Sequence, residues 1–231
     1  REQAGRSDTS DFLSKVADVP SNQIRRGDFT ESEFRRIVDA AKELESAPLF
    51  IDDTPALPIS QLAARARRLK RTHGLDVLFI DYLQLVRGTG RSENRVNEIT
   101  EITMVLKAIA KEHQIPVVAL SQLSRQAENR EDKRPQLSDL RESGSIEKDA
   151  DVVMFVYREE YYVEREQPGD HEMEKIVLWQ ERMENLRGKA EVVIGKQRHG
   201  PIGSVGLQFE GQFTRFSNLA QPWQGTASQE Y

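Results

Sequence analysis

Residues 77–80, with the sequence VLFI, are all apolar, and the run ends at Asp81. A strand that lacks the alternation of apolar and polar residues is typical of a parallel sheet, which is covered on both faces. Parallel strands are joined by long crossover segments, most often helices, so the chain must supply helices between its strands. The run therefore predicts an α/β fold in which residues 77–80 are buried on both faces.

The rest of the chain supplies the strand and helix alternation that such a fold needs. Further strands are expected at residues 49–51, 115–120, 151–156 and 190–194, and helices at residues 11–19, 30–44, 60–73 and 96–113. Thr30 and Glu33 have the spacing of a capping box, which marks the start of a helix. Residues 204–209 and 212–216 flank Glu210 and Gly211, a pattern that predicts a β-hairpin.

Three stretches differ from this core. Residues 1–10 show no apolar period and are expected to be a loop, whereas residues 159–187 are highly charged and are interpreted as an insertion with a helix at 172–186. We therefore expect an N-terminal helical segment at residues 1–46 and a core at residues 47–216 that contains the insertion. Residues 217–231 are expected to be a disordered tail.

Composition excludes several classes of protein. The 231 residues include no cysteine, which excludes disulfides and thiolate metal sites. No apolar run approaches the roughly 20 residues of a membrane span, and the polar first ten residues do not resemble a signal peptide. We therefore expect a cytoplasmic protein with no membrane partner. The net charge of −5 argues against a surface that is basic throughout, but it allows a local basic groove for nucleic acid.

Two polar residues follow expected strands. Asp81 comes directly after residues 77–80, the position at which P-loop nucleotide-hydrolysing proteins carry the Walker B carboxylate that serves Mg²⁺. Gln122 follows residues 115–120, and if the two strands are neighbours it lies beside Asp81, where an amide can sense a terminal phosphate. The alternative is that both residues are ordinary caps of the loops that follow their strands.

Two basic segments are candidates for anion binding. Lys196 and Arg198 alternate on an extended segment, so their side chains project to the same side and can reach one anion, such as a phosphate in a neighbouring subunit. Arg141 and the backbone around Gly144 could hold a nucleic-acid backbone without reading bases. The alternatives are a solvated basic turn and a surface helix start.

A nuclease-like metal site built from Asp52, Asp53 and Asp81 is a weaker interpretation. A two-metal site needs several convergent acids. No acidic triad with histidine support is visible in the sequence.

Four segments together resemble the bacterial replicative helicases of the DnaB family, in order and in spacing. They are FIDYLQL at 79–85, ALSQLSR at 119–125, RPQLSDLRESGSIE at 134–147 and KQRHGP at 196–201. The similarity extends over residues 12–216. The part of the third segment from Asp139 to Glu147 carries most of the specificity. With the pair Lys196 and Arg198 it argues against another RecA-like motor, such as a recombinase or a clock-type ATPase.

The resemblance implies an incomplete RecA-like parallel sheet flanked by helices, with a C-terminal β-hairpin. It implies an ATP-dependent 5′-3′ DNA helicase that works at the replication fork as a homohexameric ring on single-stranded DNA. ATP and Mg²⁺ are the implied cofactors, and primase and a helicase loader are the implied partners.

The resemblance also implies a role for individual residues. Asp81 would bind Mg²⁺ through water, and Gln122 would couple the γ-phosphate to the DNA-binding loops. Lys196 and Arg198 would reach into the ATP site of the next subunit, with Arg198 as the arginine finger. The implied single-strand contacts are Arg141, Glu142 and Gly144.

One element of the family pattern is missing. No G-x-x-x-x-G-K-[ST] sequence occurs in the chain, so the backbone amides and the lysine that cradle phosphates are absent. We therefore expect a fragment that does not hydrolyse ATP by itself and that leaves an apolar flank of its sheet exposed. The alternative is a non-catalytic, truncated RecA-like subunit or interaction module.

Overall fold

The computed structural model describes residues 2–90, 94–140, 143–169 and 171–219, with side chains from residue 10 onward except that of Ser143. The described residues divide into two compact units. The first consists of residues up to 53, 158–191 and 205–219, and the second of residues 54–157 and 192–204. Each unit is described separately below.

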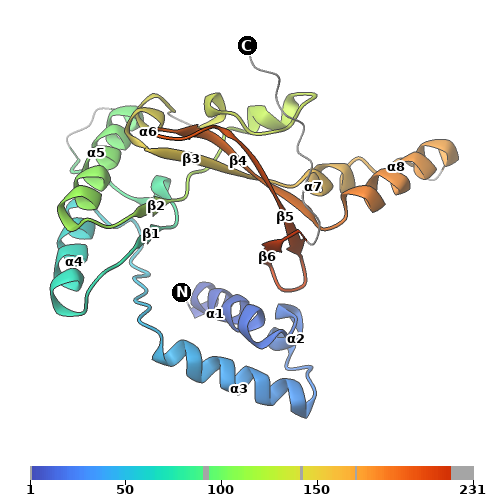
Figure 1. Ribbon diagram of the computed structural model, residues 1–231, viewed down its shortest axis with the longest axis horizontal. Helices are drawn as coiled ribbons and strands as arrows, with labels where there is room; N and C mark the ends of the chain where they lie inside the picture. Colours follow the sequence, from blue (N-terminus) through green and yellow to red (C-terminus); the bar gives the residue numbers. More distant parts are fainter. Residues whose placement is uncertain (1, 91–93, 141–142, 170, 220–231) are drawn as a thin grey trace. The chain divides into compact units, whose positions relative to one another are not determined.

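The second unit is built around two parallel strands, β1 (Leu78–Ile80) and β2 (Val117–Ala119). Helix α4 (Ile59–Thr72) precedes β1, and helix α5 (Arg95–His113) connects β1 to β2 (Figure 1). The two strands and the crossover helix between them confirm the α/β alternation that the sequence predicts.

Helices cover one face of these strands. The core joins residues of α4 and α5 to residues of α6 (Ser143–Asp149) and strand β3 (Val152–Tyr157). Its most buried residues include Ile59, Ile99 and Ile102. In α5 the buried residues recur at the three- and four-residue spacing of a helix, which is why the pattern at 96–113 predicted this helix correctly.

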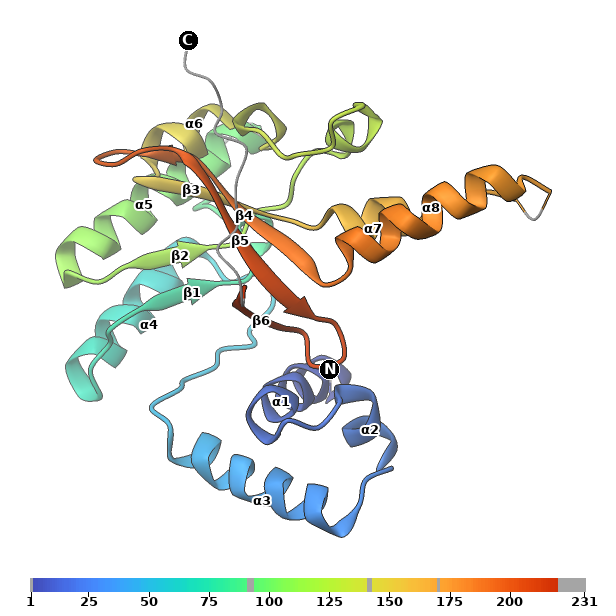
Figure 2. The ribbon, with the colours of Figure 1, turned by 45° about the vertical axis from the view of Figure 1, so that its right-hand side comes forward.

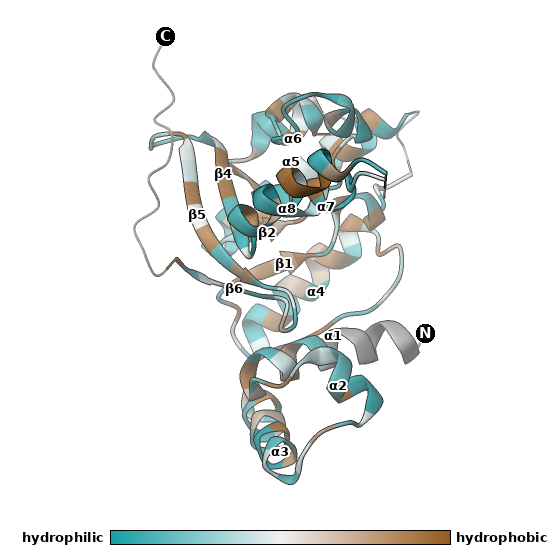
Figure 3. Cartoon of the chain, turned by 90° about the vertical axis from the view of Figure 1, so that its right-hand side faces the viewer, coloured by the Kyte–Doolittle hydropathy of each residue, from teal (hydrophilic) through white to brown (hydrophobic). Residues whose placement is uncertain are grey.

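The opposite face of the strands is exposed. Phe79 is 66% exposed, and Val118 beside it is also exposed. In β3 the burial alternates, with Val153, Phe155 and Tyr157 buried and Val152, Met154 and Val156 exposed. The expectation that residues 77–80 are buried on both faces is therefore wrong, because the described helices of this unit pack on one face only. The expectation of an exposed apolar flank is confirmed, and Figure 3 shows the hydrophobic colour of β1.

The first unit begins with three helices: α1 (Glu2–Ala17), α2 (Ser21–Arg26) and α3 (Glu31–Ser46). Helix α3 starts with the predicted capping box, in which Thr30 and Glu33 bond each other's backbone N–H. Ala17, Val19 and Ala40 form a small core between these helices.

Two predictions in this region are wrong. Residues 2–10 belong to α1 rather than to a loop, because a helix whose later turns pack on a core extends at little cost into a polar stretch. Residues 49–51 form no strand, and their apolar side chains are exposed. An apolar run of three residues is too short to distinguish a strand from an irregular segment.

The expected insertion consists of helices α7 (Glu159–Glu164) and α8 (Met173–Leu186). The indole Nε1 of Trp179 on α8 donates a hydrogen bond to the carbonyl oxygen of Val163 at 2.7 Å, which fastens the two helices together. The helix expected at 172–186 is confirmed.

Three strands complete the chain: β4 (Lys189–Gln197), β5 (Gly203–Glu210) and β6 (Arg215–Asn218). The sheet order is β3-β4-β5-β6 (Figure 2), and β5 pairs antiparallel with β6, which confirms the hairpin. Its second strand begins at Arg215 rather than at residue 212, because residues 211–214 form the turn and Thr214 has a positive φ. Strand β6 continues to Asn218, two residues into the expected tail, and residues 220–231 lie outside the described part.

None of the helices in the described ranges is both long and apolar enough to cross a membrane.

Shortening one core side chain tests the packing of α5. Ile102 is 0% exposed, so Ile102→Ala should lower the free energy of unfolding by about 2–5 kcal/mol through lost burial and the cavity left behind. On the same helix Val96 is 50% exposed, and Val96→Ala should change stability by roughly 0.5 kcal/mol or less. Denaturant unfolding of the two variants checks this. Equal losses would contradict the assignment of the buried face.

Candidate functional site: the edge formed by the ends of strands β1 and β2

The ends of β1 and β2 lie side by side. Ile80 and Ala119 are paired in the parallel register, and Leu120 N donates a hydrogen bond to Ile80 O at 2.9 Å. The ladder continues beyond the strands, because Leu83 N donates to Leu120 O at 2.9 Å. Asp81 and Gln122 therefore follow strand ends at the same edge of the sheet. The carboxyl edge of a parallel sheet is where α/β proteins bind their ligands.

Gln84 joins the two segments that leave these strands. Its amide Nε2 donates to Ser121 Oγ at 3.0 Å, and its Oε1 accepts a hydrogen bond from Gln122 N at 3.2 Å. One side chain thus holds the backbone of Gln122 against the segment that follows Asp81. Gln84 was not predicted as a site residue from the sequence. Its position as a single polar residue between Leu83 and Leu85 could have identified it.

Asp81 presents a carboxylate to solvent. The side chain is exposed and makes no hydrogen bond or ion pair with another residue of the described ranges. Mg²⁺ retains several waters in nucleotide sites and is held by one or two carboxylates together with phosphate oxygens. An exposed carboxylate at a strand end fits that donor set.

The alternative metal site is not supported. Within the described ranges no group of three or more histidine, aspartate or glutamate side chains is arranged to hold a metal ion. The described residues therefore give no support to a metal site built from paired acids.

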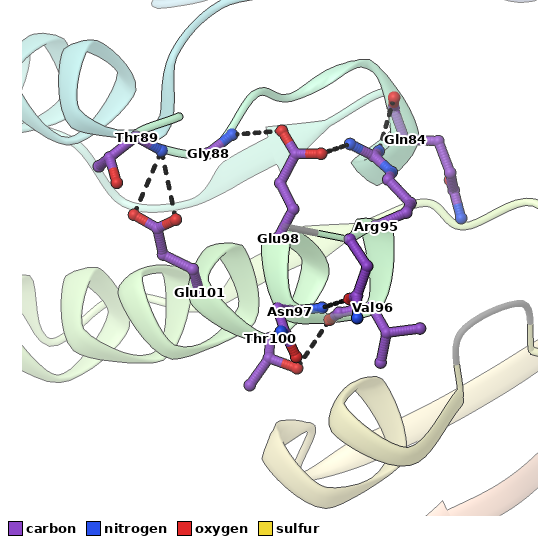
Figure 4. A network of polar contacts seen from close by, with 10 residues as sticks. Gln84, Gly88, Thr89, Arg95, Val96, Asn97, Glu98, Thr100 and Glu101 are labelled. Carbon is purple, nitrogen blue, oxygen red and sulfur yellow. Dashed lines mark hydrogen bonds and ion pairs between the residues drawn. The ribbon is translucent and has the colours of Figure 1, made fainter. Parts of the chain in front are cut away.

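A network of charged residues fixes the loop that follows Asp81 (Figure 4). Glu98, in the first turn of α5, accepts a hydrogen bond from Gly88 N at 2.8 Å and pairs with Arg95 Nη1 at 2.5 Å. Arg95 Nη2 in turn donates to Gln84 O at 2.9 Å. The network therefore runs from Gln122 through Gln84 and Arg95 to Glu98.

Gly88 is required by this network. A Cβ atom at this position would lie 2.8 Å from Glu98 Cγ and 2.8 Å from Glu101 Oε2, closer than side chains tolerate. Glu101 also accepts from Thr89 N. The absence of a side chain at Gly88 lets both glutamates approach the loop backbone.

The segment after Gln122 borders a shallow hollow. Its volume is about 370 Å³. Its lining residues are Gln122, Leu123, Ser124, Arg125, Gln126 and Asn129. The Gln122 side chain is exposed and forms no hydrogen bond within the described ranges, so its amide can take an external partner.

Lys196 and Arg198 both have partners within their own chain. Lys196 Nζ donates to the carbonyl oxygen of Glu147 in the last turn of α6. Arg198 Nη1 lies 2.9 Å from Asp151 Oδ1, and its side chain is 47% exposed. Such an exposed pair is worth only about 0.2–1 kcal/mol, so a phosphate can replace Asp151 at little cost.

The predicted DNA-contacting residues are only partly described. Arg141 and Glu142 lie outside the described residues. Gly144 belongs to α6, and a side chain built at this position would meet no atom within 4 Å in the neighbouring segments that the structure describes. The backbone at Gly144 is therefore open to an approaching ligand.

Comparison with solved structures defines the class of protein. The chain matches a structure described as that of a DnaB-like replicative helicase and its interactions with primase, with 34% identity and a TM-score of 0.77. It also matches a second solved structure, described as an ATPase domain, with 35% identity and a TM-score of 0.76. These alignments cover 91% and 90% of this chain and 48% and 69% of the two structures. The chain has the RecA-like ATPase-domain fold.

The family follows from sequence comparison. The model of the DnaB-like helicase C-terminal domain matches residues 2–218, and the chain belongs to this family. Replicative DNA helicase DnaB of Rickettsia typhi is 53% identical over 211 residues, and replicative DNA helicase DnaC of Bacillus subtilis is 44% identical over 209 residues. The matches cover 91% and 90% of this chain and 42% of each relative, so the chain spans about two fifths of their length.

Neutralising Glu98 tests the network. The backbone N–H of Gly88, followed by Arg95, holds the pKa of Glu98 below its usual value against the opposing effect of burial. A lowered pKa gives a contribution to stability that is full above the unfolded pKa and is lost as the pH falls through the folded value. Glu98→Gln should therefore lower the free energy of unfolding at pH 7 by about 1–3 kcal/mol.

Denaturant unfolding at several pH values measures this contribution. The difference in the free energy of unfolding between the parent and Glu98→Gln should stay constant from pH 7 to about 5 and shrink below about pH 4. Glu45→Gln, at an exposed position of α3, is the control and should leave stability unchanged at pH 7. A difference that persists undiminished at low pH would show that the carboxylate charge is not responsible.

Proposed function

We propose that this chain is a portion of the motor of a replicative DNA helicase, and that the whole helicase uses ATP and Mg²⁺ to move 5′ to 3′ on single-stranded DNA as a homohexameric ring. Membership of the DnaB-like helicase family supports the proposal, since the curated relatives are named replicative DNA helicases. A primase partner is suggested by the described interactions of the DnaB-like helicase that shares this fold. A helicase loader is proposed from the family resemblance alone.

The adjacent ends of β1 and β2 are the observation that carries the proposal. Asp81 would hold Mg²⁺ through its hydration water and thereby position the phosphates of ATP. Gln122 would place its free amide at the γ-phosphate, and Gln84 would keep the backbone of Gln122 in position. Bound Mg²⁺ would neutralise charge on the phosphates during hydrolysis.

The further positive charge needed at the γ-phosphate would come from a second subunit. Arg198 would leave Asp151 and approach the γ-phosphate bound by the adjacent subunit, where an arginine finger stabilises the charge of the transition state. Lys196 would assist only after giving up its bond to Glu147 O. Arg141, Glu142 and Gly144 would lie along the DNA strand, with Arg141 and the open backbone at Gly144 contacting phosphates.

Replacing the proposed magnesium carboxylate tests this function in the full-length protein. Asp81→Asn should lower Mg²⁺-dependent ATP turnover by at least about 10²-fold, because electrostatic stabilisation of the phosphates is the main catalytic effect. Asp76→Asn is the matched control, since Asp76 is exposed at the other end of β1 and should leave turnover unchanged. Absence of ATPase activity in the parent would instead favour the non-catalytic interaction module.

Mixing two inactive variants tests whether Arg198 acts in trans. Arg198→Ala should lower turnover by about 10³-fold or more while nucleotide binding is largely retained. Rings assembled from Arg198→Ala and Asp81→Asn subunits should regain part of the activity, because some interfaces then combine an intact Asp81 with an intact Arg198.

Asp151→Asn is the control for this experiment. It removes the partner of Arg198 within the subunit and should leave most of the turnover intact. Mixed rings as inactive as either parent variant would rule out action in trans, and so would normal turnover by Arg198→Ala.

A further inference from the structure

An ion pair between the half-buried Arg130 and the buried Asp139 closes the loop between Gln122 and Arg141. This loop contains two short 3₁₀ helices, η2 (Arg125–Asn129) and η3 (Leu137–Asp139). Asp139 is 3% exposed and belongs to the second of them. Arg130, just after η2, donates from Nη1 to Asp139 Oδ1 and from Nη2 to Asp139 Oδ2, both at 2.7 Å.

The pair draws together backbone from the whole loop. Arg130 also donates to Arg134 O at 2.9 Å and to Asp132 O at 3.3 Å. Asp139 Oδ2 also accepts from Gln136 N at 2.8 Å. Two parallel bonds between a guanidinium and a carboxylate fix orientation as well as distance, which a single charge contact does not.

The same residue fixes the start of the segment that carries Arg141. The carbonyl oxygen of Asp139 accepts a hydrogen bond from Ser124 N at 2.7 Å, and Leu123 and Leu140 form an antiparallel bridge. Leu123 directly follows Gln122, and Leu140 directly precedes Arg141. The chain that leaves Gln122 therefore runs beside the chain that enters the proposed DNA-contacting segment.

The burial and charge of this ion pair indicate that it fixes the geometry of the loop. Asp139 is buried whereas Arg130 is partly exposed, so removing Arg130 would leave the buried carboxylate without its opposite charge. Asp139 is held in its charged form, because its bonds to Arg130, and then that to Gln136 N, lower its pKa although burial opposes them. The charge is therefore present at neutral pH to orient Arg130 and the loop around it.

We propose that Arg130 and Asp139 are positioning residues, which hold the Leu123–Leu140 bridge in register so that the state of the nucleotide at Gln122 is passed to the segment beginning at Arg141. The inference rests on the proposed function, since it assigns a nucleotide contact to Gln122 and a DNA contact to Arg141. Neither Arg130 nor Asp139 is required to touch ATP or DNA.

ATP turnover by the assembled full-length protein, with and without saturating single-stranded DNA, tests this role. Asp139→Asn keeps the shape of the side chain and removes its charge, and Arg130→Lys keeps the charge and removes the two-pronged contact. Both variants should keep DNA-independent turnover within about twofold of the parent and lose about tenfold or more of the stimulation by DNA, as a lost coupling between sites requires.

Glu112→Gln is the matched control, because Glu112 makes a similar two-bond contact with Arg67 between α5 and α4. It should leave both rates unchanged. The double variant Gln122→Ala/Asp139→Asn should lose no more of the stimulation by DNA than the more affected single variant. The effects of substitutions in residues that act in the same coupling do not add.

Hydrogen–deuterium exchange of the amides at 124–146 gives a readout that does not depend on activity. Asp139→Asn should accelerate exchange there by about tenfold or more while α5 is unchanged, because the loop opens locally. Unchanged exchange in Asp139→Asn would overturn the proposal, and so would unchanged stimulation of its ATP turnover by DNA. An equal fall of turnover with and without DNA would also overturn it, because such a fall indicates a structural role only. If DNA does not stimulate ATP turnover by the parent protein, the proposed function is wrong. The exchange experiment would still decide whether the pair of Arg130 and Asp139 holds the loop.

Discussion

The parallel pairing of β1 with β2 is the constraint on which the site depends. The register that pairs Ile80 with Ala119 brings the ends of both strands to one edge, and the hydrogen bond from Leu120 N to Ile80 O continues the pairing beyond the strands. A parallel pair needs a crossover, and α5 supplies it while covering one face of the strands. A shift of one residue would turn the side chains after β1 to the other face and separate Asp81 from Gln122.

Local patterns in the sequence predicted the elements of this arrangement but not the contacts between them. The apolar run before Asp81, the helical period of α5 and the capping box at Thr30 each depend on neighbouring residues. The strand, the helix and the cap that they predict are confirmed, although the strand is covered on one face only. Gln84 and the pair of Arg130 with Asp139 were missed, because their partners are set by the meeting of separate segments. Helix α1 was misjudged because its packed later turns extend into a polar stretch, and residues 49–51 were misjudged because a run of three apolar residues does not define a strand.

Two polar systems of this unit differ in strength in a way that suits a motor. Gln84 and the pair of Arg130 with Asp139 are linked by several bonds each and hold the chain around Gln122 in one geometry. The pair of Arg198 with Asp151 is half-exposed and weak, so it can be exchanged for a stronger anion. Rigid contacts would therefore keep the phosphate-facing groups in place, while the weak contact lets Arg198 change partners between subunits.

A cryo-electron microscopy structure of the full-length protein, assembled with Mg²⁺ and a non-hydrolysable ATP analogue, tests the central claim most directly. The account predicts Mg²⁺ on the hydration shell of Asp81, the Gln122 amide at the terminal phosphate and the guanidinium of the adjacent subunit's Arg198 on the same phosphate. Nucleotide bound away from the ends of β1 and β2, or Arg198 still paired with Asp151 at every nucleotide-filled interface, would contradict it.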